Sequence, residues 1–332
     1  MATTARFDIP VSRRYGRLPR ATACVLAAMV TVPAGAAEKC TPIASYDYGK
    51  VPVFRTSDGM LYFRTDVDVN TDGTLESYHK DDLGFRNDKG KWDTKFALNI
   101  ICHGTNIRKP NGDLLYSYKS CPELIKEFKR LRALGWHKPG DNFVDFYAIA
   151  GVPGTKKAPP AKDKGNYRYT PCEKDGYYVS HTAKPMDPTK EVCDPARWVD
   201  SLRVPAIVMP LDKTMIAQGV KHHDLAIVRL PGTQKWVGAI VGDTNPNKIG
   251  EGTINLATRL KGMDPPKRYR QTVGLVVQDA EYFVFPGSVG SLGKLSNASD
   301  AVIQKEAARL YEERNLAKRL AFCSTSKPKP KA

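Results

Sequence analysis

Three short apolar segments follow one another closely in the middle of the chain, and each has the length of a single β-strand. They span residues 205–210, 224–230 and 235–242, and Pro231-Gly232 supplies a turn between the last two. Many short strands separated by turn signals, with few helices, favour a β-barrel core decorated with helices. The sequence therefore predicts a mainly β chain of the α+β class, built around a small barrel.

The remaining periodic segments supply further strands and a few helices. Near alternation at 61–69 and apolar runs at 96–102, 143–152 and 272–286 predict strands. Residues 121–135 carry apolar side chains at helical spacing, with Gly135 as the stop signal. Short and long helices are also expected at 253–261 and 297–320, the latter capped by Asn297.

The N-terminal segment has the features of an export signal. Several arginines between residues 13 and 20 precede an apolar stretch at 21–32, and Ala34-Gly35-Ala36 supplies small residues for cleavage. The apolar stretch is too short for a permanent membrane span. We expect residues 1–36 to be removed and the mature protein to be secreted or periplasmic, with no transmembrane segment. A retained, disordered basic leader is the alternative.

The cysteines agree with an oxidising compartment. The chain has seven, and removal of the signal with Cys24 leaves six. Six cysteines allow fifteen connectivities, so the pairing stays open, although short loops favour Cys102–Cys121 and Cys172–Cys193 and leave Cys40–Cys323. Wide spacings and the lack of a Cys-x-x-Cys pair favour disulfides over a zinc site.

Residues 37–325 are expected to form a single domain, followed by a disordered basic tail at 326–332. The formal net charge is +16, and removal of five arginines and one aspartate with the signal leaves +12. This balance suits anionic surroundings. It disfavours a polycationic substrate unless the binding cleft is locally acidic.

Two acidic residues flank one turn-rich loop directly after the third strand. Asp243 follows the strand and Glu251 begins the next ordered segment. Two carboxyl groups across a gap are the minimum equipment for glycoside hydrolysis, one as acid and one as base or nucleophile. A turn-forming Asp and a Glu that opens a helix are the alternative reading.

Several short motifs resemble glycoside hydrolase family 75, the fungal-type chitosanases. A "P-x-I-V-x-P" strand is found here at Pro205–Pro210, and a "G-V-x-x-x-D-L-A" segment at Gly219–Ala226. The "G-D-T" element is found at Gly242–Thr244 and the "I-G-E" element at Ile249–Glu251. A more widely spaced version of "D-x-D-x-D-G" is found at Asp66–Gly73. The resemblance implies that Asp243 and Glu251 are the catalytic pair of an inverting hydrolase acting on glucosamine-containing polymers. We expect Glu251 to donate the proton and Asp243 to hold the water, with the reverse assignment as the alternative. By analogy with other small-barrel glycosidases, the barrel is expected to be of the double-psi type.

Other polar and aromatic residues are candidates for binding the sugar. Asp66 and Asp68 share one face of a predicted strand and could attract a protonated aminosugar. The run from Asp66 to Asp72 could instead be a loose calcium loop or a solvated turn. Counted from Asp68, position twelve is His79, where an EF-hand needs a glutamate. Thr244 and Asn245 could position water or a sugar hydroxyl, and Trp236 could stack on a ring.

The chain lacks a Gly-x-Ser-x-Gly elbow, a glycine-rich phosphate loop and a His-Glu-x-x-His helix. We therefore expect a monomeric, chitosanase-like enzyme without cofactor or metal, whose partner is a polysaccharide and not nucleic acid. Two alternatives remain open. One is a hydrolase of peptidoglycan, and the other is a non-catalytic protein that binds the cell wall or an anionic polymer.

Overall fold

The computed structural model describes residues 40–47, 49–136, 138, 140–153, 169–263 and 275–317, which all belong to one compact unit, Glu38–Ala332. The expected signal peptide, the basic tail and Cys323 lie outside the described residues.

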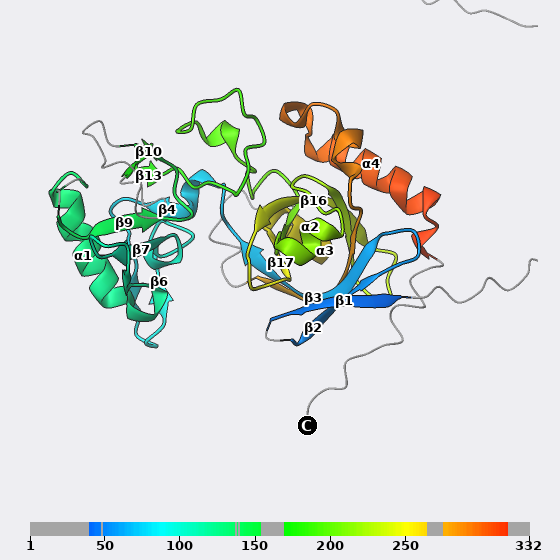
Figure 1. Cartoon of the computed structure of the whole chain (residues 1–332), viewed down its shortest axis with the longest axis horizontal. Coiled ribbons are helices and arrows are strands. Elements are labelled where there is room, and N and C mark those ends of the chain that lie inside the picture. The colour runs from blue at the N-terminus through cyan, green and yellow to red at the C-terminus, as the bar shows by residue number, and fades with distance from the viewer. Residues whose placement is uncertain are drawn as a thin grey trace, which may run out of the picture. The chain divides into compact units, whose positions relative to one another are not determined.

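A closed six-stranded β-barrel forms the centre of the fold (Figure 1). The ring runs β3-β17-β14-β16-β15-β18 and returns to β3. Pairs β14–β16 and β17–β3 are parallel, and the others are antiparallel. The strands are β3 Leu61–Asn70, β14 Ala206–Met209, β15 Leu225–Arg229, β16 Trp236–Thr244, β17 Glu251–Thr253 and β18 Val276–Val284. The mainly β prediction, with a barrel core and added helices, is confirmed, and the double-psi topology stays a prediction.

The barrel is filled by apolar side chains that alternate along its strands. Ile207 and Met209 of β14 and Ala239 and Val241 of β16 belong to this interior core. Helices α2 (Lys213–Ala217) and α3 (Ile254–Lys261) add side chains to the same core, and strands β1 (Thr41–Tyr46) and β2 (Val51–Arg55) extend the sheet beyond β3.

Helix α4 (Asp300–Glu313) covers part of the barrel's outer wall, where it contacts β15 and β16 (Figure 1). Its buried residues, among them Ile303 and Ala307, form a second core with Ile227 and Ile240. The predicted start at Asn297 is wrong, because that residue ends a separate 3-10 turn and Ser299 occupies the cap position. The helix also ends earlier than predicted, at Glu313.

A third core lies among shorter elements between β3 and β14. Helix α1 (Cys121–Ala133) packs its buried face on small sheets. These contain β7 Thr105–Arg108, β8 Leu114–Tyr116, β9 Phe143–Phe146, β4 Tyr78–His79, β12 Glu173–Lys174, β13 Tyr177–Tyr178, β5 Phe85–Arg86, β6 Trp92–Asp93, β10 Gly151–Pro153 and β11 Tyr169–Pro171.

Two strand predictions in this region fail for one physical reason. The run 96–102 contains no strand and ends in a 3-10 turn, Ile101–His103. The expected strand at 143–152 is divided into β9 and β10. In both places most of the apolar residues are buried, several of them in the third core, although Phe96, Tyr147 and Val152 are exposed. Burial alone does not require a strand.

Both short-range disulfide predictions are confirmed. Cys102 pairs with Cys121, with Cα atoms 5.7 Å apart, and Cys172 pairs with Cys193 at 5.2 Å. Cys40 is also disulfide-bonded. The proposed pairing of Cys40 with Cys323 stays a prediction, because Cys323 lies outside the described residues.

Candidate active site

Four neighbouring strands bring Asp243 and Glu251 onto one row of the barrel. Glu251 of β17 lies beside Asp68 of β3 on one side and beside Val208 of β14 on the other. Val208 in turn lies beside Asp243 of β16. Residues that are directly opposite on adjacent strands direct their side chains to the same face of a sheet. The row therefore presents three carboxylates on one face.

A β-bulge decides which face Asp243 occupies. Ile207 pairs with Val241, but the next pair is Val208 with Asp243, so Gly242 is passed over. Ile207 and Val241 point into the barrel core, and simple alternation from Val241 would direct Asp243 inward as well. The extra residue turns Asp243 to the outer face, as bulges beside functional sites often do.

The strand spacing fixes the separation of the two acids. Because β14 alone lies between β16 and β17, the Cα atoms of Asp243 and Glu251 are about 9–10 Å apart. Inverting glycosidases hold their carboxyl groups about 6.5–9.5 Å apart, which leaves room for a water molecule. The backbone geometry therefore accommodates the inverting arrangement.

Asp243 and Glu251 both line a cleft of about 810 Å³. Thr244 and Asn245 line it too, and both side chains also accept hydrogen bonds from the backbone. Thr244 Oγ1 accepts from the backbone N–H of Leu211 (3.3 Å), and Asn245 Oδ1 accepts from that of Asn247 (3.2 Å).

Asp72 is a third carboxyl group in this cleft, and the sequence did not single it out as a site residue. It lies two residues beyond the end of β3. Its Oδ1 accepts hydrogen bonds from Tyr78 Oη (3.0 Å) and from Ser180 Oγ (3.4 Å). Its membership of an acidic run was visible in the sequence, but its proximity to Asp243 depends on the packing of distant segments.

Burial perturbs the two aspartates of the cleft in the same direction. It raises the pKa of Asp243 to about 6, assisted by the nearby charge of Glu251 and opposed by backbone hydrogen bonds. One of these comes from the N–H of Ala183, 2.8 Å from Asp243 Oδ1. Burial first, and the charge of Asp243 second, raise the pKa of Asp72 well above its usual range. Carboxyl groups with such values can hold a proton near neutral pH.

Glu251 has a different neighbour. Lys248 Nζ lies 3.2 Å from Glu251 Oε1 and 2.7 Å from Asp68 Oδ2. Burial alone would lower the pKa of Lys248, but the hydrogen bond to Asp68 and the two negative charges outweigh burial and raise that pKa. A charged lysine therefore orients Glu251 from one side of the cleft.

Three of the residues predicted to bind substrate, Asp66, Asp68 and Trp236, do not line the cleft. Asp66 is exposed, and its Oδ1 accepts from the backbone N–H of Asp279 (2.8 Å) at the irregular β3–β18 pairing. Trp236 stacks on Tyr311 of α4, with ring centres 5.0 Å apart. Asp68 lies beside Glu251 in the sheet and binds Lys248, which lines the cleft.

Aromatic and imidazole side chains complete the cleft. They are His103, Tyr118, Tyr147 and His181. Tyr118 is 54% exposed, and its ring centre lies 4.8 Å from that of His103. Burial lowers the pKa of both histidines, so neither adds positive charge at neutral pH. Exposed rings beside carboxyl groups are suited to packing against sugar faces.

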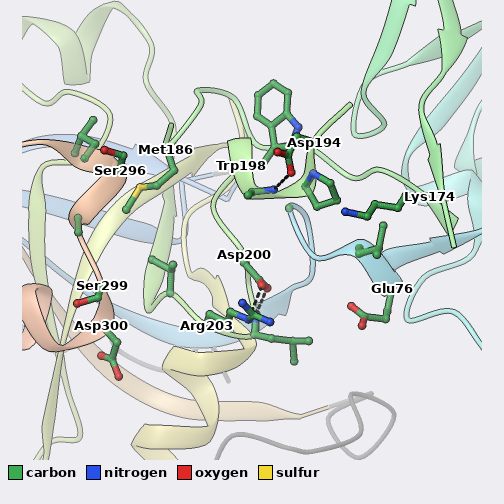
Figure 2. Close-up of a pocket in the computed structure, with 18 residues that line it drawn as sticks. Glu76, Lys174, Met186, Asp194, Trp198, Asp200, Arg203, Ser296, Ser299 and Asp300 are labelled. Carbon is green, nitrogen blue, oxygen red and sulfur yellow. Dashed lines mark hydrogen bonds and ion pairs between the residues drawn. The ribbon is translucent and has the colours of Figure 1, made fainter. Parts of the chain in front are cut away.

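A second cavity, of about 830 Å³, is lined by Glu76 and by three aspartates that are engaged by the fold (Figure 2). Figure 2 shows Asp200 directed at Arg203, to which it is paired at 3.3 Å. Asp194 accepts from a backbone N–H of its own turn, and Asp300 pairs with Arg259. Within the part of the chain that the structure describes, the first cleft is therefore the better candidate for acid–base chemistry.

The acidic side chains of the run from Asp66 to Asp72 bind groups of the protein. Asn70 Oδ1 accepts from the backbone N–H of Asp72 (2.7 Å), while the carboxylates of Asp68 and Asp72 bind Lys248 and Tyr78. Among the described residues, no group of three or more His, Cys, Asp or Glu side chains is arranged to hold a metal ion. None of the helices in the described ranges is long and apolar enough to cross a membrane.

Comparison with known proteins does not assign the chain to a family. No protein-family model matches the chain, and no curated protein matches it.

Proposed function

We propose that this protein is an exported, monomeric glycoside hydrolase that cleaves β-1,4-linked, glucosamine-containing polysaccharide by single displacement with inversion. The observation that carries the proposal is the placement of Asp243 and Glu251 in one cleft, on either side of β14 and in contrasting surroundings. The resemblance to family 75 chitosanases points to the same two residues. The two disulfides support export, because such bonds persist in oxidising compartments.

The surroundings favour Asp243 as the proton donor and Glu251 as the base, the reverse of the assignment expected from the sequence. Asp243 has a pKa raised to about 6 by burial, so a useful fraction is protonated near neutral pH. Glu251 is held by Lys248 and is the carboxylate placed to accept a proton from water.

In the proposed reaction, Asp243 gives its proton to the glycosidic oxygen as the bond to the anomeric carbon breaks. Glu251 takes a proton from a water molecule that attacks that carbon from the opposite face of the sugar. One water is consumed, the configuration is inverted, and both carboxyl groups return to their starting states by proton exchange with solvent.

The ionisable residues of the cleft bear on the choice between a cationic and an anionic polymer. Its described lining contains three carboxyl groups, those of Asp72, Asp243 and Glu251, and one lysine that is already paired. Raised pKa values reduce the charge of Asp72 and Asp243 near neutral pH, so in a chain of net charge +16 the cleft lining is closer to neutral and would repel protonated chitosan less than a basic surface would. An anionic peptidoglycan strand would gain less from these groups.

The test is hydrolysis of chitosan, chitin and purified peptidoglycan, measured as the release of reducing ends. We expect chitosan to be cleaved, and Asp243→Asn and Glu251→Gln each to lower kcat by about 10²–10⁴-fold. Glu76→Gln, a carboxylate of the second cavity, is the matched control and should keep full activity. Cleavage of peptidoglycan alone would overturn the substrate, and activity that survives both variants would overturn the site.

The strong positive charge favours a second candidate function, the binding of an anionic cell-wall polymer without catalysis. Such binding should weaken steeply as salt is added and should survive the double variant Asp243→Asn, Glu251→Gln. That result, together with no hydrolysis of any polymer, would replace the enzymatic proposal.

A further inference from the structure

Asp68 does not line the cleft, although its side chain is 46% exposed and was a candidate for attracting the sugar. We propose that Asp68 is a positioning residue that anchors the ammonium group of Lys248, so that Lys248 holds one oxygen of Glu251 and leaves the other to act as the base. The catalytic consequence rests on the proposed function, but the anchoring of Lys248 can be measured without any substrate.

The ammonium group of Lys248 lies between two carboxylates of neighbouring strands. Asp68 of β3 and Glu251 of β17 are directly opposite one another in a parallel pair. Lys248 Nζ is 2.7 Å from Asp68 Oδ2 and 3.2 Å from Glu251 Oε1. The shorter contact is made with the carboxylate outside the cleft. Asp68 therefore fixes the position of the ammonium group, and Glu251 receives the longer contact.

The backbone that follows Lys248 is held firmly by the barrel. Ile249 is 1% exposed and belongs to the interior core. The carbonyl of Gly250 accepts from the backbone N–H of Asp68 (2.8 Å), and a Cβ atom at Gly250 would lie 2.8 Å from the backbone oxygen of Asp66. What this leaves to be fixed is the long, flexible side chain of Lys248, whose rotamer freedom must be restrained before it can orient a neighbour.

A further carboxylate near Lys248 is already engaged elsewhere. Asp47 is close enough for its charge to interact with that of Lys248, but its carboxylate accepts a hydrogen bond from the backbone of Ile249. Within the described part of the chain, the ion pairs of Lys248 are those with Asp68 and Glu251. Asp68 is therefore the group that can hold Lys248 without taking part in the reaction.

The contact with Lys248 makes the two oxygens of Glu251 unequal. Lys248 binds Oε1, whereas no described residue donates a hydrogen bond to Oε2. In the proposed reaction, Oε2 takes one proton from water as the water oxygen bonds to the anomeric carbon, and it releases that proton to solvent after the products leave. Asp68 and Lys248 neither gain nor lose a proton. Their effect is on orientation, to which the rate of such a step is sensitive at the scale of about 1 Å.

The variant Asp68→Asn keeps the shape of the side chain and removes its charge. We expect it to lower kcat on chitosan by about 5–20-fold and to leave KM within about twofold, because Glu251 is less well oriented while the cleft lining is unchanged. Lys248→Met should lower kcat at least as much. Lys248→Arg can still bridge both carboxylates and should restore most of the activity.

The matched control is Asp66→Asn, two residues earlier on the same strand. Asp66 accepts from the backbone N–H of Asp279, and the amide oxygen of the variant can still do so. It does not contact Lys248 and does not line the cleft, so kcat and KM should both stay at the wild-type values.

A double-mutant cycle decides whether Asp68 acts through Lys248. If it does, adding Asp68→Asn to Lys248→Met causes no further loss of kcat. If Asp68 instead attracts the sugar directly, Asp68→Asn raises KM both with and without Lys248→Met, and the proposal is overturned. Losses of kcat that multiply in the double variant would overturn it as well.

The anchoring itself is measured without substrate, from the ¹H–¹⁵N NMR signals of the lysine ammonium groups in the full chain labelled with ¹⁵N-lysine. The spectra are recorded in cold, mildly acidic buffer, and the Lys248 signal is assigned by its absence in Lys248→Arg. We expect a slowly exchanging Lys248 signal in the wild type, in Asp66→Asn and in Glu251→Gln. The signal should be lost in Asp68→Asn.

The two measurements separate the anchoring from the proposed function. A wild type that lacks the slowly exchanging signal, or an Asp68→Asn protein that keeps it, would overturn the anchoring. If the signal depends on Asp68 but no polymer is cleaved, the anchoring stands, while the proposed hydrolase function fails and the catalytic role of Asp68 fails with it.

Discussion

Asp243 and Glu251 lie two strands apart on the barrel, with the single strand β14 between them. This relationship does not follow from their eight-residue separation in sequence. It results from the parallel pairing of β14 with β16 and the antiparallel pairing of β14 with β17. The loop that connects the acids therefore crosses over β14, and the spacing of the acids is set by the sheet and not by the loop.

The first prediction concerns the bulge at Gly242. A Cβ atom at this position would lie 2.6 Å from the Cβ of Ala206 and 3.2 Å from Val199. We expect Gly242→Ala to push β16 away from β14, to lower the free energy of unfolding by about 1–3 kcal/mol, and to lower chitosan hydrolysis by displacing Asp243. Urea unfolding and reducing-end assays measure the two effects.

The control is Gly290→Ala, where an added Cβ meets no atom within 4 Å and φ is not positive. It should unfold like the wild type. Equal behaviour of the two variants would show that close packing at the bulge does not hold Asp243 in place.

Local patterns predicted the elements whose apolar residues form continuous runs or recur at helical spacing. Strands β14, β15 and β16 and helices α1 and α3 follow the apolar periodicity of the sequence closely. The two acids flanking one loop were also visible. These features depend on neighbours in the chain, which is the information that a sequence pattern contains.

The rest of the site depends on contacts between distant segments. The bulge at Gly242 appears only when β16 is paired with β14, and Asp72 meets the cleft through Tyr78 and Ser180. Trp236 was a candidate for the sugar because it is aromatic, yet it stacks on Tyr311 of α4. Residue type suggested candidates for the chemistry, but the direction of each side chain depends on the tertiary structure.

A second prediction is the pH dependence of the proposed reaction. The donor must carry its proton, and burial raises the pKa of Asp243 to about 6. We therefore expect kcat/KM on chitosan to fall as the pH rises through about 6, because Asp243 then loses the proton that the leaving oxygen needs. A profile that stays flat to pH 8 would exclude Asp243 as the donor.

The same raised pKa predicts that the site destabilises the fold. Between the ordinary value of 3.8 and about 6, the folded protein binds more protons at Asp243 than the unfolded chain does. Stability should therefore fall as the pH rises through this window. Asp243→Asn avoids the buried charge, and its amide oxygen can still accept from Ala183.

We expect Asp243→Asn to be more stable than the wild type by about 1–2 kcal/mol at pH 8, with the difference shrinking toward pH 4. Urea unfolding at the two pH values measures this. A variant that is less stable at pH 8, or a difference that is independent of pH, would contradict the assigned burial of the charge.

A fourth prediction concerns Tyr118, whose exposed ring lines the cleft and lies against His103. If the ring packs on a sugar, Tyr118→Ala should raise KM for chitosan by about 3–10-fold and leave kcat nearly unchanged. Tyr118→Phe keeps the ring and should behave like the wild type. A loss of kcat at constant KM would instead place Tyr118 near the reacting bond.

The last prediction concerns Asp224, which belongs to one of the motifs that resemble the chitosanases, and tests whether it serves the fold or the reaction. Asp224 is fully buried, and its carboxylate accepts from the backbone N–H groups of Lys221 (2.8 Å), Gly287 (3.0 Å) and Val289 (3.0 Å). It therefore joins the start of β15 to the turn that follows β18 and does not line the cleft.

Asp224→Ala leaves these buried N–H groups without an acceptor, so the free energy of unfolding should drop by about 3–5 kcal/mol. Asp224→Asn retains one acceptor oxygen and should lose less. Asp194→Ala, which removes an acceptor from one N–H at the surface, should cost about 1 kcal/mol or less. Below its melting temperature, Asp224→Asn should hydrolyse chitosan with a nearly unchanged pH profile. A changed profile would mean that the charge of Asp224 affects the ionisation of the cleft residues, even though its hydrogen bonds all serve the fold.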